Sequence, residues 1–287
     1  MTGNMEPRVE HKSLRCADGY LLKYSHYHST ESKAVVIFAS ALGVSRQYYH
    51  RLAVYLCQQG YDCFSFDYRG TGEQDAPLAK DAAIEHWGQR DIEAMIQQAL
   101  NLNLSVHFIG HSIGGQLLGL APSASKLRSV MLVAASAPYW KRWEGSERLK
   151  LLFLSYVLIP VLGALKDPFP IAALGLGNIR MPSRFIKRWA EWMREPDYLL
   201  APMFKLDRSG YENISCRLWT LGFRDDELAP EINIRHLSGF YSKAKVSLDM
   251  LDPAQEGLSH IGHNGLFHKR SEEALWPKVL NYLSEID

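Results

Sequence analysis

The chain has 287 residues, of which 47% are hydrophobic and 22% charged, and its formal net charge is +1. These values are ordinary for a globular protein with a sizeable core, and they allow one large domain or a core with an inserted subdomain. The balanced charge, without a basic run that carries interleaved aromatic residues, argues against nucleic-acid binding.

Short apolar runs alternate with helical periodicity along most of the chain. Two strands at 8–14 and 20–28 are joined by the turn Asp18-Gly19. Buried strands of the parallel type are predicted at 33–40, 62–68, 103–110, 129–136, 216–222 and 244–251. Helices are predicted at 46–59, 82–100, 229–238 and 271–286, with another beginning after residue 112. This order predicts an α/β fold with a mostly parallel eight-stranded sheet and helices on both faces.

The alternation stops near Ala137. Residues 138–212 contain four tryptophans, many leucines and several prolines, but no clear strand. We therefore expect a core in two parts, 1–137 and 213–287, interrupted by a helical cap at 138–212. The apolar segment 151–165 is shorter than the roughly 20 residues of a spanning helix and contains Pro160. It predicts a buried or pocket-lining helix and no spanning segment, with peripheral membrane contact as the alternative.

The first residues and the cysteines bear on location. The opening "MTGNMEPRVEHK" is polar and lacks the apolar core of a signal peptide. The four cysteines have no Cys-x-x-Cys spacing, which favours free thiols in a reducing compartment. Both features predict a cytoplasmic protein.

The stretch "HFIGHSIGGQLLG" at 107–119 contains the pattern Gly-x-Ser-x-Gly around Ser112. A predicted strand precedes the pattern and a predicted helix follows it, which is the setting of a nucleophile on a tight strand-to-helix bend. Such a bend would place the hydroxyl at the C-terminal edge of the sheet. The N–H of Ile113 and the helix dipole could stabilise an oxyanion there. The competing interpretation is an ordinary turn serine.

A serine hydroxyl needs a base, and on this type of fold the chain order is Ser, acid, His. "FRDDELAP" follows the strand at 216–222, and Asp225 is the predicted acid. Asp226 is the alternative, and it would otherwise be a solvated neighbour.

The segment "SHIGHNGLFH" supplies three histidines after the last strand. His263 is the predicted base, His260 is the second choice, and His268 is expected to cap or contact the final helix. Asp225 would then orient the imidazole of His263 and favour its cation. A zinc site on His260-x-x-His263 lacks a companion ligand at suitable spacing, so no metal is predicted.

A second oxyanion donor is expected in the loop "ALGVS" that follows the strand at 33–40. Gly43 permits the bend, and the N–H of Leu42 is the predicted donor. The N–H of Ala41 remains a close competitor.

These motifs carry a family resemblance. "VVIFASALG", "FDYRGTG", "GHSIGG", "LGFRDDELAP" and "IGHNGLFH" together resemble the α/β-hydrolases of the serine esterase, lipase and aminopeptidase-like branch, close to a group of mostly uncharacterised bacterial members. The resemblance implies a helical cap between the sixth and seventh strands. It also implies hydrolysis of an ester, thioester or amide without a cofactor, and it gives Asp67 and Arg69 a structural role in tying loops together.

The predicted function is therefore a serine hydrolase that forms an acyl-enzyme on Ser112. The leucines and aromatic residues of the cap favour a small-molecule acyl ester with an apolar group, although they would equally serve to pack the cap on the core. An acyltransferase with the same triad and a catalytically silent hydrolase-fold binding protein are the alternatives. A homodimer is compatible with the sequence.

Overall fold

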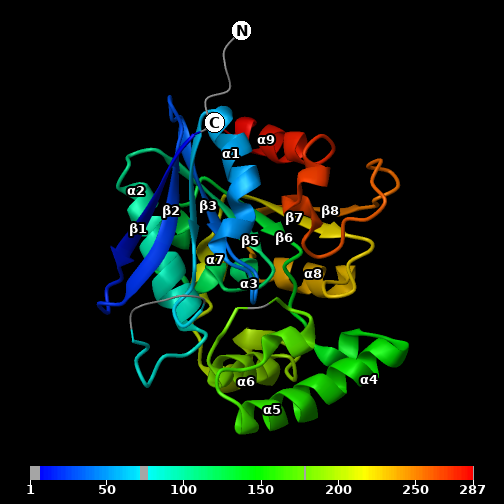
Figure 1. The fold of residues 1–287 in the computed structure, drawn as a ribbon. Helices are drawn as coiled ribbons and strands as arrows, with labels where there is room; N and C mark the ends of the chain where they lie inside the picture. The colour runs from blue at the N-terminus through cyan, green and yellow to red at the C-terminus, as the bar shows by residue number, and fades with distance from the viewer. Residues whose placement is uncertain (1–6, 72–76, 178, 287) are drawn as a thin grey trace.

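The computed structural model describes residues 7–71, 77–177 and 179–286, and its centre is one eight-stranded sheet (Figure 1). The strand order is β1-β2-β4-β3-β5-β6-β7-β8. β1 pairs with β2 and β2 with β4 in antiparallel fashion, and all other neighbours are parallel. The predicted fold class is confirmed. The strands are β1 Arg8–Arg15, β2 Leu21–His28, β3 Ala34–Ala39, β4 Tyr61–Phe66, β5 Ser105–His111, β6 Ser129–Val133, β7 Arg217–Phe223 and β8 Lys245–Leu251.

The strands lie where their apolar runs predict them, with ends shifted by a few residues. Every residue of β3, β4 and β6 is buried, as expected for central strands covered on both faces. The run at 129–136 forms a shorter strand than expected because Ala134 has a φ of 49°, which no strand residue adopts.

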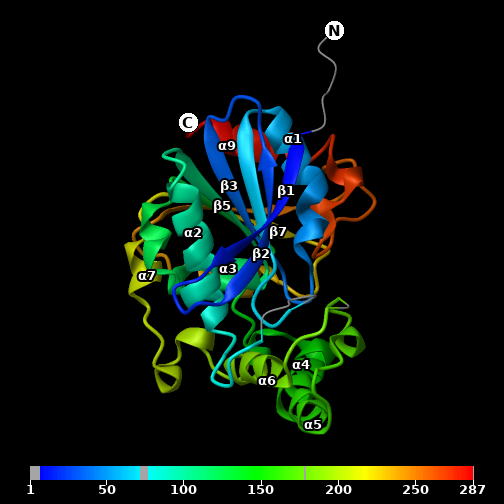
Figure 2. The same ribbon diagram turned by 60° about the vertical axis from the view of Figure 1, so that its left-hand side comes forward.

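Helices cover both faces of the sheet, with α1 on one side and α2 on the other (Figure 2). Apolar side chains of α1 (His50–Gln58) and α9 (Trp276–Ser284) join one core cluster. Those of α2 (Glu93–Leu100) and α7 (Ser209–Asn213) join the other. α8 (Glu231–Ser238) contributes to both clusters, through Ile234 and Leu237.

Most of the chain between β6 and β7 is helical, and the part that carries α4, α5 and α6 lies beyond the edge of the sheet at which β5 leads into α3 (Ile113–Gln116) (Figure 1). Its main helices are α4 Gly145–Phe153, α5 Ile159–Leu165 and α6 Ser183–Trp192. α6 buries Phe185, Ile186 and Trp192 in the same core cluster as α2. That 138–212 forms a separate domain stays a prediction.

α4 and α5 are joined by a π-helical turn, Leu154–Leu158, into one continuous helix of 21 residues that we call the long helix. The segment expected at 151–165 thus begins earlier, at Gly145. Pro160 does not break the helix. Proline lacks an N–H and crowds the carbonyl four residues before it, and the wider turn just ahead of Pro160 gives that carbonyl room. Within the described residues, this is the one helix long and apolar enough to cross a membrane, judged by length and composition.

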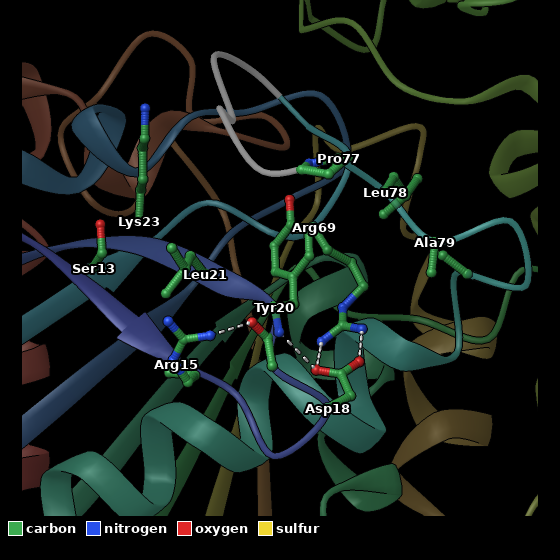
Figure 3. Close-up of a pocket in the computed structure, with 12 residues that line it drawn as sticks. Ser13, Arg15, Asp18, Tyr20, Leu21, Lys23, Arg69, Pro77, Leu78 and Ala79 are labelled. Atoms are coloured by element: carbon green, nitrogen blue, oxygen red, sulfur yellow. Dashed lines mark hydrogen bonds and ion pairs between the residues drawn. The ribbon is translucent and has the colours of Figure 1, made fainter.

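The loop after β4 is tied to its surroundings by ion pairs. Arg69 is buried and its guanidinium donates to Asp91 at 2.7 Å and to Asp18 at 2.5 Å. Figure 3 shows the guanidinium of Arg69 paired with the carboxylate of Asp18, and both residues line a cavity of about 500 Å³. Asp67 accepts the backbone N–H of Arg46 at 2.8 Å and also pairs with its guanidinium. These contacts agree with the loop-tying role that the resemblance implies for Asp67 and Arg69.

The four cysteines are unpaired, as expected. The cytoplasmic location inferred partly from them stays a prediction.

The sheet order creates a crevice beside β3. After β3 the chain passes to β4 on one side and then returns to β5 on the other. In open α/β sheets, the loops that leave such neighbouring strands in opposite directions diverge and leave a binding crevice at their carboxyl ends. The loops after β3 and β5 are the ones that carry Leu42 and Ser112.

Candidate active site

Ser112 lies on a tight bend between β5 and α3. Its φ of 52° and ψ of −119° are strained for a residue with a side chain, and its N–H donates to the carbonyl of Val133 at 2.9 Å. A Cβ at Gly110 would lie 2.5 Å from the Cα of Gly115, and one at Gly114 would lie 2.3 Å from the carbonyl oxygen of Ala39. The two glycines flanking the serine are therefore required by close backbone packing.

The helix after Ser112 is shorter than expected. α3 has only four residues, and a helix of one turn has almost no macrodipole. The contribution of the helix dipole is therefore expected to be small, and it stays a prediction. The N–H of Ile113 remains, because the first residues of a helix have no acceptor within it.

His263 lies in the loop between β8 and the short turn Gly265–Phe267. Its Nδ1 lies 2.8 Å from Oδ2 of Asp226, and the two side chains are 13% and 1% exposed. The other carboxylate oxygen of Asp226 accepts the N–H groups of Leu228 at 2.9 Å and Ala229 at 3.3 Å. The acid is thus fixed and buried, and the remaining partner of its carboxylate is the imidazole of His263.

The predicted pairing of Asp225 with His263 is wrong, because Asp225 faces the backbone of the histidine loop. Its oxygens accept the N–H groups of Ile261 at 2.8 Å and Gly262 at 3.0 Å, and Nδ1 of His260 lies 2.6 Å away. Burial raises the pKa of Asp225, but the two N–H donors and the charge of His260 outweigh it and lower the pKa overall. Adjacent residues in the turn after β7 point in different directions, so each acid has its own partner.

Contacts in the loop after β3 distinguish the two candidate oxyanion donors, Ala41 and Leu42. The N–H of Ala41 donates to the hydroxyl of Tyr49 at 2.9 Å, so it is already engaged. Leu42 lines the same cavity as Ser112 and follows Ala41 directly. Of the two alternatives, the geometry favours Leu42.

Tyr49 and His111 connect this loop to both other parts of the site. The Tyr49 hydroxyl lies 2.9 Å from Nδ1 of His111, and Nε2 of His111 lies 2.9 Å from the carbonyl oxygen of His263. Burial, and then the charge of His263, lower the pKa of His111 to about 3. The neutral ring therefore accepts from Tyr49 and donates to His263. Sequence reasoning missed this bridge, since nothing in the local pattern links Tyr49 to His111.

Ser112, Ile113, Leu42 and His263 border one cavity of about 800 Å³. Side chains of the helical insertion close its other side. The main apolar ones are Trp143, Leu151, Phe153, Leu154, Leu158, Leu174, Leu176, Trp189 and Met193.

The oxyanion loop and the insertion meet backbone to backbone at two glycines. A Cβ at Gly177 would lie 2.2 Å from the carbonyl oxygen of Gly43, and a Cβ at Gly43 would lie 2.0 Å from that of Leu176. Both glycines have positive φ, 75° at Gly43 and 104° at Gly177. No side chain fits at this contact.

Among the described residues, one group could hold a metal ion, and it is separate from this cavity. Ligand atoms of Glu10, His26 and His28 on β1 and β2 lie within 4.8 Å of one another. Arg8 and Lys12 pair with the two oxygens of Glu10, so a cation would compete with two positive charges. His260 and His263 each face a different aspartate, which gives no support to a zinc site between them.

Residues 36–273 match the model of the alpha/beta hydrolase family. The match covers most of the chain, and the chain belongs to this family. No curated protein sequence matches it.

Solved structures with the same fold are numerous and distant in sequence. An esterase from Exiguobacterium antarcticum is 18% identical with a TM-score of 0.63, over 96% of this chain and 100% of that one. A soluble variant of monoglyceride lipase from Saccharomyces cerevisiae, in complex with a substrate analogue, is 13% identical with a TM-score of 0.69, over 99% and 97%. A thermostable carboxyl esterase from Bacillus coagulans is 14% identical with a TM-score of 0.62, over 97% and 98%. At these identities the likeness establishes the fold.

Proposed function

We propose that the protein is a serine hydrolase that cleaves a carboxylic ester, with Ser112 as nucleophile, His263 as base and Asp226 as the orienting acid. The observation that carries the proposal is the pair of His263 with the buried Asp226 at the border of the cavity that also contains the strained Ser112. The bond to Asp226 assigns the proton to Nδ1 of His263 and leaves Nε2 free to accept one.

The reaction follows from these positions. Oγ of Ser112 attacks the ester carbonyl carbon while its proton passes to Nε2 of His263. The N–H groups of Ile113 and Leu42 stabilise the resulting oxyanion. The bond to the alcohol oxygen then breaks, and His263 gives its proton to the departing alcohol. Water repeats the sequence on the acyl-enzyme, which releases the carboxylic acid and restores the serine.

The substrate class follows from the cavity. Its volume of about 800 Å³ suits a small molecule, and the leucine and tryptophan side chains of the insertion favour an apolar acyl group. The structural relatives include a thioesterase domain, but an ester is chosen over a thioester or amide because esterases and a monoglyceride lipase recur among them.

The test is covalent labelling by a fluorophosphonate, followed by intact mass measurement. We expect one label on the wild type and none on Ser112→Ala. Ser136 borders the same cavity, so Ser136→Ala is the matched control and should label like the wild type. An unlabelled wild type, or a label that persists in Ser112→Ala, would contradict the proposal.

A panel of p-nitrophenyl esters of increasing acyl length then tests the apolar pocket. We expect kcat/KM to rise from acetate to medium chains. A steady fall from acetate onward would contradict the assigned acyl group.

A further inference from the structure

The long helix is apolar, and most of it is exposed. Of the 18-residue window with the highest apolar content, only 11% of residues are buried. Core helices of this composition are normally covered on all sides. Here a row of large apolar side chains faces outward, and we call it the apolar face. Its members are Leu149, Phe153, Tyr156, Val157, Val161 and Leu165, which are 44–74% exposed.

The positions of the apolar face recur at helical spacing, so they form one stripe along the helix. In both views the insertion that carries α4 and α5 lies at one end of the molecule, beyond the edge of the sheet (Figures 1 and 2). A contiguous exposed stripe of this kind marks a contact surface, because single scattered apolar residues are the usual pattern on a monomer.

The other side of the same helix belongs to the cavity. Leu151, Leu154 and Leu158 border the space that contains Ser112. Phe153 borders the cavity and is also 54% exposed, so it lies where the cavity meets the apolar face. A molecule leaving an apolar phase at this face would pass Phe153 directly into the cavity.

Positive charge is concentrated around the apolar face. Residues 140–166 contain five basic and two acidic side chains, although the whole chain is only +1. Basic residues stand at both ends of the stripe: Lys141, Arg142 and Arg148 come before it and Lys166 after it. Lys150 lies within its first turn, where it pairs with Glu147 at 3.2 Å and borders the cavity. Such flanking cations attract an anionic lipid surface, each contributing on the order of 1 kcal/mol.

Two aromatic residues complete the pattern. The rings of Trp140 and Tyr156 lie edge to face at 6.3 Å. The ammonium of Lys141 and the guanidinium of Arg148 lie 5.3 and 5.4 Å from the centre of the Trp140 ring. Tryptophan and tyrosine beside cations are typical of the headgroup level of a bilayer.

The helix is bound to the protein along one side, which excludes spanning in this fold. Ile159 is fully buried, and the guanidinium of Arg194 donates to the carbonyl oxygen of Ser155 at 3.1 Å. A helix held this way can lie in the plane of a membrane surface with its free side in the lipid.

We propose that the apolar face docks on an anionic lipid bilayer, so that the opening of the cavity at Phe153 meets the lipid phase. The docking itself does not depend on chemistry at Ser112. Only the consequence that the substrate is a lipid ester taken from the membrane rests on the proposed function.

The test uses the full chain carrying Ser112→Ala, which keeps hydrolysis out of the measurement. Binding to vesicles of 70% phosphatidylcholine and 30% phosphatidylglycerol is measured by co-sedimentation, with pure phosphatidylcholine vesicles for comparison. We expect binding to the anionic vesicles at least tenfold tighter than to the neutral ones. Adding Lys166→Glu should reduce this preference.

The double variant Val161→Glu/Leu165→Glu should weaken vesicle binding at least tenfold, because both side chains are exposed on the apolar face and neither borders the cavity. When Ser112 is kept, the same double variant should hydrolyse a short soluble ester at the wild-type rate. The matched control is Ile232→Glu, at a residue 55% exposed on α8, and it should bind vesicles like the parent.

Two outcomes would overturn the docking proposal: absence of vesicle binding by the parent, or unchanged binding by the double variant. Light scattering tests the alternative that a second copy of the chain, instead of a membrane, covers the apolar face. A stable dimer that the double variant converts to a monomer would assign the apolar face to self-association instead. Fluorophosphonate labelling is independent of all these results, so failure of docking and failure of the proposed chemistry are distinguished.

Discussion

The loops around Ser112 and the long helix that covers them are stabilised in opposite ways. Around Ser112, polar groups are buried or partly buried, and they are paired: Asp226 with His263, Asp225 with the histidine loop, and Tyr49 with His111. Along the long helix, apolar side chains such as Leu149 and Leu165 are 67% and 74% exposed. The loops around Ser112 thus place polar groups in the interior, where apolar groups are usual, and the long helix places apolar groups on the surface, where polar groups are usual.

The contrast predicts which substitutions should change the stability of the fold and which should not. Removing a partner from a buried polar pair leaves a group that neither protein nor water satisfies, and this affects both stability and geometry. Changing an exposed apolar side chain has little effect on folding, so its consequence should appear only when something covers it. The predictions below test each side of this contrast, beginning with the largest effect.

The sharpest test separates the two adjacent aspartates. Asp226→Asn should lower kcat/KM for a short ester by about 10³–10⁴-fold, because an amide cannot keep the proton on Nδ1 of His263. Asp225→Asn should lower kcat/KM less than tenfold and reduce the free energy of unfolding by about 1–2 kcal/mol. A larger loss of activity at 225 than at 226 would reverse the assignment of the acid.

The buried ring of His111 predicts a pH dependence of stability. Burial lowers its pKa in the folded protein to about 3, whereas the unfolded chain has a value of about 6.5. The unfolded state therefore binds more protons between these values, and stability is lost as pH falls through this window. The loss should be about 2 kcal/mol between pH 6.5 and 5.

Urea unfolding at several pH values measures this slope. His111→Asn should be less stable at neutral pH and should show a flatter dependence on pH. The exposed His50→Gln is the control and should keep the wild-type slope. A wild-type slope retained by His111→Asn would show that other groups cause it.

The contact between Gly43 and Gly177 can be tested with a matched pair of glycines. Gly175 and Gly177 both have positive φ, but a Cβ at Gly175 meets nothing within 4 Å. Gly175→Ala should cost about 1–2 kcal/mol of stability from backbone strain alone, with kcat unchanged. Gly177→Ala should cost about 2–3 kcal/mol and lower kcat about tenfold, because the added carbon displaces the loop that carries Leu42. If Gly175→Ala and Gly177→Ala changed kcat equally, the contact between the insertion and the loop that carries Leu42 would have no role in catalysis.

The smallest effect is expected on the outer side of the long helix. Val161→Ser, at a residue 49% exposed, should change the free energy of unfolding by less than about 0.5 kcal/mol in the absence of vesicles. Ile159→Ser, two residues earlier but fully buried, should cost about 2–4 kcal/mol. Thermal unfolding of both variants measures the difference between the two sides of one helix.

Much of the fold was predictable because its signals are local. The apolar runs that form β3, β4 and β5 lie almost within the expected ranges, and the Gly-x-Ser-x-Gly pattern specifies the bend at Ser112 from residues within the bend itself. A strand or a tight turn depends on its own sequence, so reading that sequence is sufficient.

The acid and the bridging residues were not predictable, because they depend on directions in space. Asp225 and Asp226 differ by one position, and only the course of the turn after β7 decides which one faces His263. The link from Ala41 through Tyr49 to His111 joins residues on three separate elements. The length of the long helix was underestimated for another reason: the apolar run at 151–165 was taken as the whole element, whereas the helix already begins at Gly145, in a stretch that also contains charged residues.

The positive φ of Ser112 has a consequence for how such a site persists. A residue with a side chain in this conformation costs about 1–2 kcal/mol relative to glycine, which adopts it freely. A chain under pressure for thermal resistance alone would gain by exchanging the serine for glycine. Keeping the hydroxyl at this position therefore lowers the stability of the fold. The difference in melting temperature between Ser112→Gly and Ser112→Ala would measure this cost.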